Sequence, residues 1–420
     1  MKTLTATFRI VTPMFCGGAD QQAELRVPSI KGAIRFWWRA LMWEKVGGDI
    51  KKLHGQESAL FGSSQGGQSR VLIRVVQGTK VTPISAGKIL KRSGDGFFES
   101  SSQYSPPDIV GEGARYLGYG VMEAFGSRKK NKFAGQVTRS CYPCPIEDFT
   151  VEFLFRSEEG TKEVDQAIIA LGTFGGLGSK SRKGYGSLTI TSLKEKVRGE
   201  SREIDLRIPE EQAKELIKGN SLPGWTAFSK NSRVLILRGD QNESPLELMN
   251  RIGSDLVFFR SYGKEGRVFK APSEKRFTDD HDLMDRVINK SGTPSTHPER
   301  IAFGLPQNYF FTSTNGKGGV EPSQHERRAS PLFLHIHQRS KDETPLAVIS
   351  FLPAKFLPDG EEISVGKDRG RKTLVACKTE NEFYDPILDW MQSLVTGKRG
   401  DHKQTTQSFR NPIAIPSIKA

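Results

Sequence analysis

The segment IEDFTVEFLFRSEEGTKEVDQAIIALGTFGGLGSKSRKGYGSLTITSL, residues 146–193, holds a strand pattern, a helix pattern, a glycine-rich loop and a second strand pattern. Phe149, Val151, Phe153 and Phe155 occupy alternate positions, which predicts a strand with one buried face over residues 146–156. A helix is predicted over about residues 162–173, and a strand over residues 186–193. The segment therefore favours a fold in which helices and strands share one core.

The residues before this segment add a matching set of elements. Residues 3–11 alternate and are rich in β-branched types, which predicts a strand. A helix is predicted over residues 29–46, and a strand over residues 69–77. Residues 93–113, where glycine, serine and proline dominate, predict a long excursion or flap. Strand, helix, strand, interruption, strand, helix, strand is the order of a ferredoxin-like unit, which RNA-recognition motifs also use.

The second half of the chain carries a weaker version of this pattern. We predict strands over residues 233–238, 330–338 and 346–353, helices over residues 244–260 and 381–395, and mostly irregular structure over residues 279–317. A length of 420 residues suits two domains. We therefore expect an α+β protein with two tandem ferredoxin-like domains, residues 1–200 and a degenerate copy at residues 201–420.

The charge of the chain favours a polyanionic partner. Lys and Arg number 62 against 48 Asp and Glu, a formal net charge of +14, and nucleic acid is the commonest partner of so basic a chain. No stretch reaches the ~18 to 20 apolar residues that a membrane-spanning helix needs. Lys2 and Arg9 interrupt the first strand, unlike the apolar segment of a secretion signal. We expect a cytoplasmic protein with no membrane partner.

The predicted helix over residues 29–46 has a basic row. Lys31, Arg35 and Arg39 recur every four residues, with Trp38 beside them. A core-facing stripe lies on another side: Ile30, Ala33, Ile34, Trp37 and Leu41. A cationic row with an exposed aromatic suits phosphate contact and base stacking. The alternative is a solvated face with Trp38 tucked under a neighbouring loop.

The glycine-rich loop, GGLGSKSRKGYG at residues 175–186, is the second candidate for RNA contact. Its glycines allow close backbone approach, and it offers cations, hydroxyls and backbone N–H groups without an acid. It lacks the Gly-Lys-Ser/Thr ending and the strand-loop-helix order of a nucleotide-binding P-loop. The alternative is a flexible solvent loop. The candidate residues are Gly176, Gly178, Lys180, Ser181, Arg182, Lys183 and Gly184.

No catalytic, metal or cofactor site follows from the remaining residues. His54 is the one histidine near the basic N-terminal surface, and no sequence neighbour pairs with it. His335 and His337 alternate on a predicted strand without a third metal ligand, and Asp20 is a single carboxylate. Cys141 and Cys144 form one Cys-x-x-Cys whose other ligands would have to be remote, so reduced thiols are the better interpretation.

Several blocks together resemble a known family. They are IVTPMF with GGA at residues 10–19, RVPSIKGAIRFWWRA at residues 26–40, LFG at residues 60–62, the glycine loop, and RRASP at residues 327–331. This pattern is similar to the first-named RAMP subunit of Cmr complexes, the type III-B CRISPR effectors. The resemblance implies two ferredoxin-like domains, contact with guide and target RNA near the guide 3′ end, and contact with neighbouring RAMP subunits. It also implies that another subunit cuts the target.

We therefore expect a non-catalytic RNA-binding and assembly subunit of a type III-B interference complex. Two alternatives remain. One is a metal-independent endoribonuclease that processes guide RNA on the same fold. The other is a scaffold whose glycine loop contacts only protein.

Overall fold

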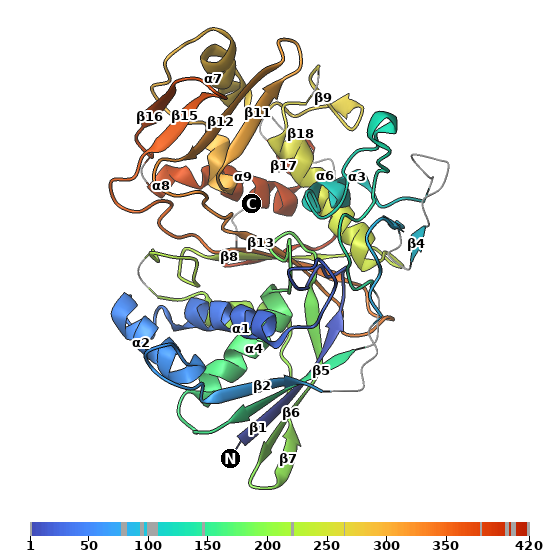
Figure 1. Ribbon diagram of the computed structural model, residues 1–420, viewed down its shortest axis with the longest axis vertical. Coiled ribbons are helices and arrows are strands. Elements are labelled where there is room, and N and C mark those ends of the chain that lie inside the picture. The colour runs from blue at the N-terminus through green and yellow to red at the C-terminus, as the bar shows by residue number, and fades with distance from the viewer. Residues whose placement is uncertain are drawn as a thin grey trace. The chain divides into compact units, whose positions relative to one another are not determined.

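The computed structural model describes residues 2–76, 82–92, 96–98, 108–144, 148–219, 222–263, 265–378, 380–399, 403–404 and 409–417 (Figure 1). The chain divides into two compact units whose segments alternate along the sequence. Unit 1 comprises residues 1–253, 333–352 and 409–417, and unit 2 comprises residues 254–332, 353–408 and 418–420. The mixed α and β content expected from the sequence is confirmed.

The first sheet of unit 1 contains five strands in the described part of the chain, in the order β2-β5-β1-β6-β7, all antiparallel. Every second side chain of β1 is buried, because alternate residues of a strand point to one face. Phe8 pairs with Phe149 of β5, and their rings stack with centroids 5.5 Å apart. The strands are β1 (Lys2–Ile10), β2 (Val71–Val75), β5 (Phe149–Phe155), β6 (Leu188–Val197) and β7 (Glu200–Glu203).

Two helices of unit 1 lie between this sheet and a second one (Figure 1). They are α1 (Val27–Met42) and α4 (Thr161–Phe174), which pack on each other. The second sheet has the order β13-β14-β8-β19. Its strands are β8 (Arg233–Arg238), β13 (Leu332–His337), β14 (Leu346–Phe351) and β19 (Ile413–Ile415). Trp37 of α1 contacts Phe333 of β13 with ring centroids 5.6 Å apart, so the core continues across the helix layer.

The two sheets repeat one connection pattern. Along the chain the first set runs β1, α1, β2, β5, α4, β6, and the spatial order of its strands is β2-β5-β1-β6. The second runs β8, α6 (Pro245–Arg260), β13, β14, α9 (Asp385–Thr396), β19, with the order β13-β14-β8-β19. In each set the first strand is central and pairs with the third and the last.

Further elements of unit 1 are shorter. They are α2 (Ile50–Phe61), β3 (Ile89–Leu90), β4 (Phe97–Phe98), α3 (Glu112–Leu117), η1 (Arg128–Lys130) and α5 (Pro209–Leu216). Asp49 starts α2, since its side chain accepts a hydrogen bond from the backbone N–H of Lys52.

Unit 2 has its own antiparallel sheet in the order β11-β12-β15-β16, with α7 packed on β12 and β15. These elements are β11 (Gln307–Phe311), β12 (Gly316–Pro322), β15 (Ile363–Lys367), β16 (Lys372–Val375) and α7 (Thr278–Asn289). The others are β9 (Arg267–Val268), β10 (Ala271–Pro272), η2 (Glu299–Phe303), α8 (Glu380–Phe383), β17 (Lys398–Arg399) and β18 (Lys403–Gln404).

Most predicted elements are confirmed to within a few residues. The exceptions are informative. Residues 279–317 were predicted as mostly irregular, which is wrong, because α7, η2, β11 and the start of β12 together occupy more than half of them. Helix α1 ends at Met42, before the predicted residue 46, and α2 was not predicted. Within the flap prediction for residues 93–113, residues 93–95 and 99–107 lie outside the described residues.

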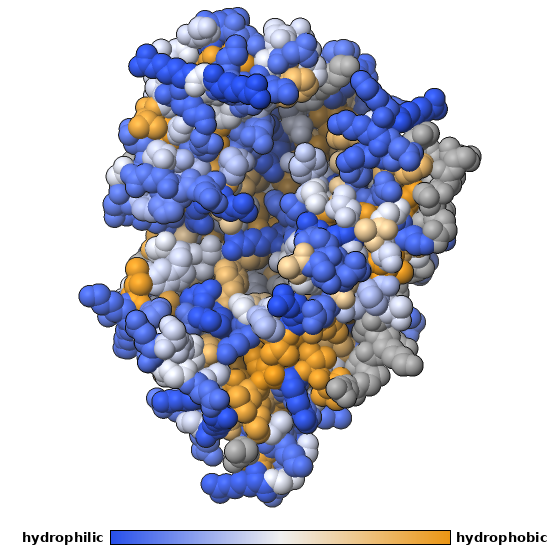
Figure 2. Space-filling view, viewed as in Figure 1, coloured by the Kyte–Doolittle hydropathy of each residue, from blue (hydrophilic) through white to orange (hydrophobic). Residues whose placement is uncertain are grey.

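The exterior is consistent with the polar composition. None of the helices that the structure describes is long and apolar enough to span a bilayer. Figure 2 shows hydrophilic residues over much of the face in view, with hydrophobic residues gathered in its lower half.

Candidate nucleic-acid interface

The basic row predicted from the sequence lies along α1. Pro28 lies in the first turn of α1, where a backbone N–H would have no partner within the helix. Ile30, Ile34 and Trp37 are buried on the opposite side of the helix. Lys31, Arg35 and Arg39 are half-buried. The helix therefore presents three cations along one partly exposed edge, as predicted.

A buried carboxylate neutralises part of this row. Glu57 of α2, whose side chain is 6% exposed, lies 2.7 Å from Arg35 Nε and 2.5 Å from Arg39 Nη1 through one oxygen, Oε1. This acid comes from a different helix, so the residue spacing within α1 gives no sign of it. Both arginine side chains remain at least one-third exposed, so they are not closed off from a phosphate.

Lys31 differs from the two arginines. No carboxylate in the described part of the chain pairs with its ammonium. Partial burial, and next the positive charge of Arg35, lower its pKa from the usual range. A cation that is destabilised by its surroundings gains from an approaching phosphate. Lys31 is therefore the member of the row whose electrostatics favour an anion most directly.

Trp38 does not lie on the exposed side. It is 1% exposed and packs edge-on against Phe61 of α2, with ring centroids 6.0 Å apart. The prediction that Trp38 stacks a base is wrong for this structure, because α2 covers the position that the helical periodicity left open.

The glycine loop is tied to its surroundings by backbone hydrogen bonds. Leu177 N–H donates to Gly186 O, Ser179 N–H to Phe15 O, and Gly186 N–H to Pro13 O, each at 2.9 Å. These bonds contradict the alternative of a flexible solvent loop. They fasten residues 176–186 to the turn that follows β1.

Close packing of the neighbouring backbone and side chains is enough to explain why these loop positions are glycine, without a ligand. A Cβ at Gly176 would lie 2.5 Å from Gly186 O, and one at Gly178 would lie 2.4 Å from Phe15 O. Gly184 is buried against Met249 and Leu334. Gly178 alone among these three is exposed, and Ser179, Lys180, Ser181, Arg182 and Lys183 are half-buried. The cations at the tip of the loop are therefore partly exposed, whereas the glycines at its two ends are needed for close packing.

Arg182 connects the glycine loop to α1. Its guanidinium lies 5.3 Å from the ring centroid of Phe36 on α1 and 4.6 Å from that of Phe333 on β13. Phe36 follows Arg35 in the helix. The contact therefore places the glycine loop beside α1.

Sequence reasoning missed residues on the other flank of the loop. A Cβ at Gly120 would lie 3.8 Å from Lys180 Nζ, and Arg139 Nη1 donates to Ser179 Oγ at 3.4 Å. Tyr119, beside Gly120, is 69% exposed. Tyr119 lies outside the sequence blocks that carry the family resemblance, so only the tertiary structure could reveal an exposed aromatic one residue from the glycine that approaches Lys180.

Two histidines lie beneath the loop. His335 is fully buried and donates from Nδ1 to Gly175 O at 2.6 Å, and its Nε2 lies 3.4 Å from His337 Nδ1. Burial lowers the pKa of His335 to about 4 and that of His337 well below its usual value. Neutral, hydrogen-bonded imidazoles support the loop.

The remaining chemical candidates are not assembled into a site. His54 is exposed on α2, and Asp20 caps its own turn by accepting from Gln22 N–H. Cys141 and Cys144 are buried free thiols, and burial raises the pKa of Cys141 to about 12. In the described residues no group of three or more His, Cys, Asp or Glu could hold a metal ion.

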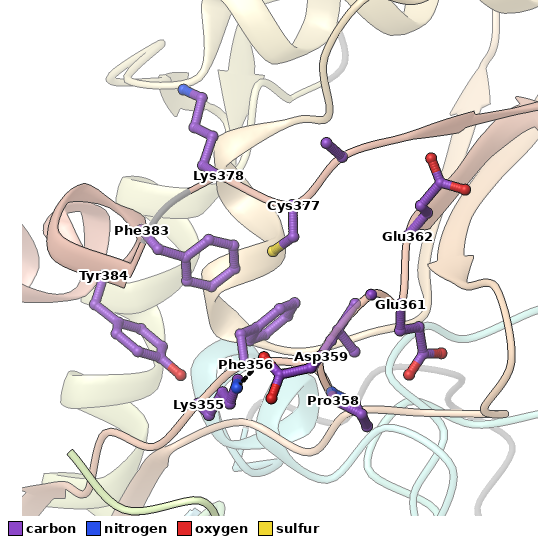
Figure 3. Close-up of a pocket in the computed structure, with 13 residues that line it drawn as sticks. Lys355, Phe356, Pro358, Asp359, Glu361, Glu362, Cys377, Lys378, Phe383 and Tyr384 are labelled. Atoms are coloured by element: carbon purple, nitrogen blue, oxygen red, sulfur yellow. Dashed lines mark hydrogen bonds and ion pairs between the residues drawn. The ribbon is translucent and has the colours of Figure 1, made fainter.

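A cavity of about 330 Å³ in unit 2 is unsuited to phosphate. Figure 3 shows Phe356, Cys377, Phe383 and Tyr384 around it, with Lys355 paired to Asp359. Glu361 and Glu362 add negative charge to its lining. Glu361 accepts from the backbone N–H groups of Gln324 and His325, and such bonds hold its pKa below the usual range although burial opposes them.

Residues 7–189 match the model of the RAMP superfamily, a segment that contains both α1 and the glycine loop. The chain resembles the Cmr RAMP subunit. Over 188 residues, 44% of this chain and 93% of the relative, it is 28% identical to CRISPR system Cmr subunit Cmr1-2 of Pyrococcus furiosus. The resemblance inferred from the sequence is confirmed.

A second relative and one solved structure are similar. Subunit Cmr1-1 of the same organism is 32% identical over 174 residues, which cover 41% of this chain and 43% of that protein. The crystal structure of Cmr1 from Pyrococcus furiosus in its apo form covers 92% of this chain and 96% of its own, with 19% identity and a TM-score of 0.49. The sequence similarity to each of the two subunits thus extends over less than half of this chain.

Proposed function

We propose that this chain is a non-catalytic RNA-binding and assembly subunit of a type III-B CRISPR (Cmr) complex. The observation that carries the proposal is the contact of Arg182 with Phe36, which brings the glycine loop against α1 within the RAMP segment. The partners would be guide and target RNA near the guide 3′ end, together with neighbouring RAMP subunits, in the cytoplasm.

On this surface each residue has a role set by its surroundings. Lys31, Lys180 and Lys183 would act as point charges on phosphates, and Arg35 and Arg39 would share their guanidiniums between Glu57 and a phosphate. Arg182 would contact phosphate from its position on Phe36. Ser181 and the exposed backbone at Gly178 would add hydrogen bonds, with Gly176 and Gly184 holding the loop in shape.

The fold proposal follows from the repeated connection pattern. A strand order in which the first strand pairs with the third and the last is that of the ferredoxin-like unit. We assign β1 to β6 to one such domain and β8 to β19 to a second, with the boundary near residue 200. This assignment needs no sequence repeat between the two domains, because the connections between strands alone specify the topology.

The test removes three lysines of the surface and measures RNA affinity. In the variant with Lys31→Gln, Lys180→Gln and Lys183→Gln, we expect weaker binding of a fluorescein-labelled single-stranded RNA in the full chain. Log affinity should also fall less steeply with log salt between roughly 50 and 200 mM KCl, by about 0.7 per lost phosphate contact. Fluorescence anisotropy measures both quantities.

The matched control removes the same charge elsewhere. Lys194, Lys196 and Lys218 are exposed in unit 1 outside this surface, and changing all three to Gln should leave the salt dependence nearly unchanged. Equal losses of RNA affinity in the two triple variants would show that net charge alone causes the effect. The surface around α1 and the glycine loop would then be rejected as the RNA-binding site. If RNA had no effect on assembly with neighbouring subunits, the scaffold alternative would be favoured instead.

The endoribonuclease alternative has a separate test. Wild-type protein is incubated with repeat RNA without metal, beside the His54→Ala variant. We expect intact RNA with both proteins. Cleavage that His54→Ala abolishes would establish the alternative.

A further inference from the structure

An aromatic groove in unit 2 is not used by the proposed surface. Its volume is about 660 Å³, within the range of ligand pockets. Its walls come from the chain after α6, from α7 and from β11. The aromatic residues that line it are Tyr262, Phe277, His281, Tyr309, Phe310 and Phe311.

The centre of the groove is a stack of flat rings. Tyr262 and His281 lie 3.8 Å apart between centroids with an interplanar angle of 14°, and Phe311 meets His281 edge-on at 5.2 Å. Phe310 is 55% exposed at the same wall. Such rings are fixed by their neighbours, so stacking a further flat group on them costs little side-chain entropy.

Cations surround the rings. Lys275 Nζ lies 6.0 Å from the Tyr262 centroid, Lys317 Nζ lies 5.6 Å from the Phe310 centroid, and the Arg300 guanidinium lies 4.6 Å from the Tyr309 centroid. A cation at that distance from an aromatic face suits the phosphate of a nucleotide whose base stacks on the ring.

Acids equal these cations in number around the groove. Asp280 accepts from the backbone N–H groups of Glu299 and Arg300, at 2.7 and 2.8 Å, and Asp282 lies 3.0 Å from His281. Glu265 also lines the groove. The position of the cations against the ring faces, and not a net charge, therefore suits a phosphate.

One polar atom of the lining lacks a partner. Arg300 Nε is buried and has no hydrogen-bond partner in the part of the chain that the structure describes. A buried donor without a partner is costly, and a base edge carries carbonyl and ring-nitrogen acceptors of the kind that satisfy such a donor.

We propose that this groove holds an unstacked base of single-stranded RNA, with Tyr262 and His281 as its stacking platform. The inference rests on the proposed function, since it assumes that RNA reaches the protein. It adds a second contact that depends on exposed bases, whereas the surface around Lys31 and Lys180 depends on phosphates. Paired bases are hidden inside a duplex, so the groove selects single strands.

The first experiment needs no variant. Single-stranded RNA carrying 4-thiouridine is irradiated with the full wild-type chain, and the crosslinked peptides are identified by mass spectrometry. We expect crosslinks at Tyr262, His281 or Phe310. RNA that binds and crosslinks only to residues of unit 1 would overturn the inference and leave the proposed function intact. A wild-type chain that binds no RNA would overturn both.

The second experiment measures the stacking itself. Tyr262→Ala should weaken single-strand binding roughly tenfold and leave duplex binding unchanged, whereas Tyr262→Phe should retain wild-type affinity. The control is Phe125→Ala, because Phe125 is 74% exposed in unit 1 and should be neutral. Unchanged single-strand affinity of a folded Tyr262→Ala variant would reject the platform. Protection of Tyr262 by a neighbouring subunit in place of RNA would assign the groove to protein.

Discussion

His335 Nδ1 donates a 2.6 Å hydrogen bond to the carbonyl oxygen of Gly175, the first residue of the glycine loop, across 160 positions of the sequence. Gly175 also packs on Trp37, where a Cβ would lie 2.3 Å from the indole Nε1. The start of the loop is thus held from two sides, by a neutral imidazole and by the core of α1.

This bond predicts a dependence of stability on pH. Burial lowers the folded-state pKa of His335 to about 4, whereas an unfolded histidine titrates near its ordinary value of 6.5. Between these values the unfolded chain binds a proton that the folded chain does not. The contribution of His335 is therefore complete above pH 6.5 and is lost as the pH falls toward 4, by roughly 3 kcal/mol.

Urea unfolding at pH 7 and pH 5 checks this, with His335→Asn as the comparison. Asparagine keeps a neutral donor but does not titrate, so the free energy of unfolding should fall less between the two pH values. An equal fall in both proteins would mean that His335 contributes nothing to the acid sensitivity.

The negative charge of Glu57 offsets part of the positive charge of the basic row on α1. Removing that charge should therefore lower the stability of the fold and raise its affinity for RNA. Glu57→Gln removes the carboxylate that Arg35 and Arg39 share, at a cost of about 1 to 2 kcal/mol in the free energy of unfolding. The two guanidiniums then become available to phosphate, so RNA affinity should rise and depend more steeply on salt. Denaturation and anisotropy give the two values. Glu163→Gln, which removes an exposed partner of Lys45, changes net charge equally and should affect neither strongly.

Alanine substitutions at Gly178 and Gly199 distinguish the cost of backbone strain from the cost of steric crowding. Both have positive φ, +83° and +95°, but a Cβ at Gly178 would lie 2.4 Å from Phe15 O, whereas one at Gly199 meets nothing within 4 Å. Gly199→Ala should cost about 1 to 2 kcal/mol, and Gly178→Ala should cost more. Thermal unfolding of the two variants measures both losses of stability. RNA affinity should fall for Gly178→Ala only, and equal effects in both variants would show that the loop tolerates displacement.

Unit 2 depends on a buried ion pair. Arg399 pairs with Asp255, which is 0% exposed and also accepts from Trp390 Nε1 at 2.9 Å. Arg399→Met leaves that carboxylate without its cation and should destabilise unit 2 by roughly 3 to 5 kcal/mol. Tryptophan fluorescence during denaturation follows the change through Trp390. The double variant with Asp255→Asn should recover part of the loss, and failure to do so would attribute the effect to packing.

The sequence by itself determined the elements whose patterns are local. The alternation of β1 and β5 and the buried stripe of α1 follow from residue spacing, so their positions could be predicted. β8 is buried on both faces, yet its run of branched residues predicts its bounds. The blocks around α1 and the glycine loop also specified the resemblance to RAMP subunits.

Other elements are strands or helices because of their neighbours. β12 carries three glycines within GKGGVEP, and its hydrogen bonds to β11 and β15 determine its conformation. The amphipathic helix α7 is strongly polar, so its apolar side, which includes Leu283, Met284 and Ile288, was too sparse to predict a helix.

Only the tertiary structure decided the chemistry of the candidate interface. Glu57 reaches Arg35 from another helix, α2 buries Trp38, and Arg182 lies on Phe36. Residue spacing determines which side of a helix a residue occupies, but it carries no information on what a distant segment places there. The positions of the cations along α1 and the loop were therefore set by the sequence, whereas their pairing and their exposure were set by packing between segments far apart in the chain.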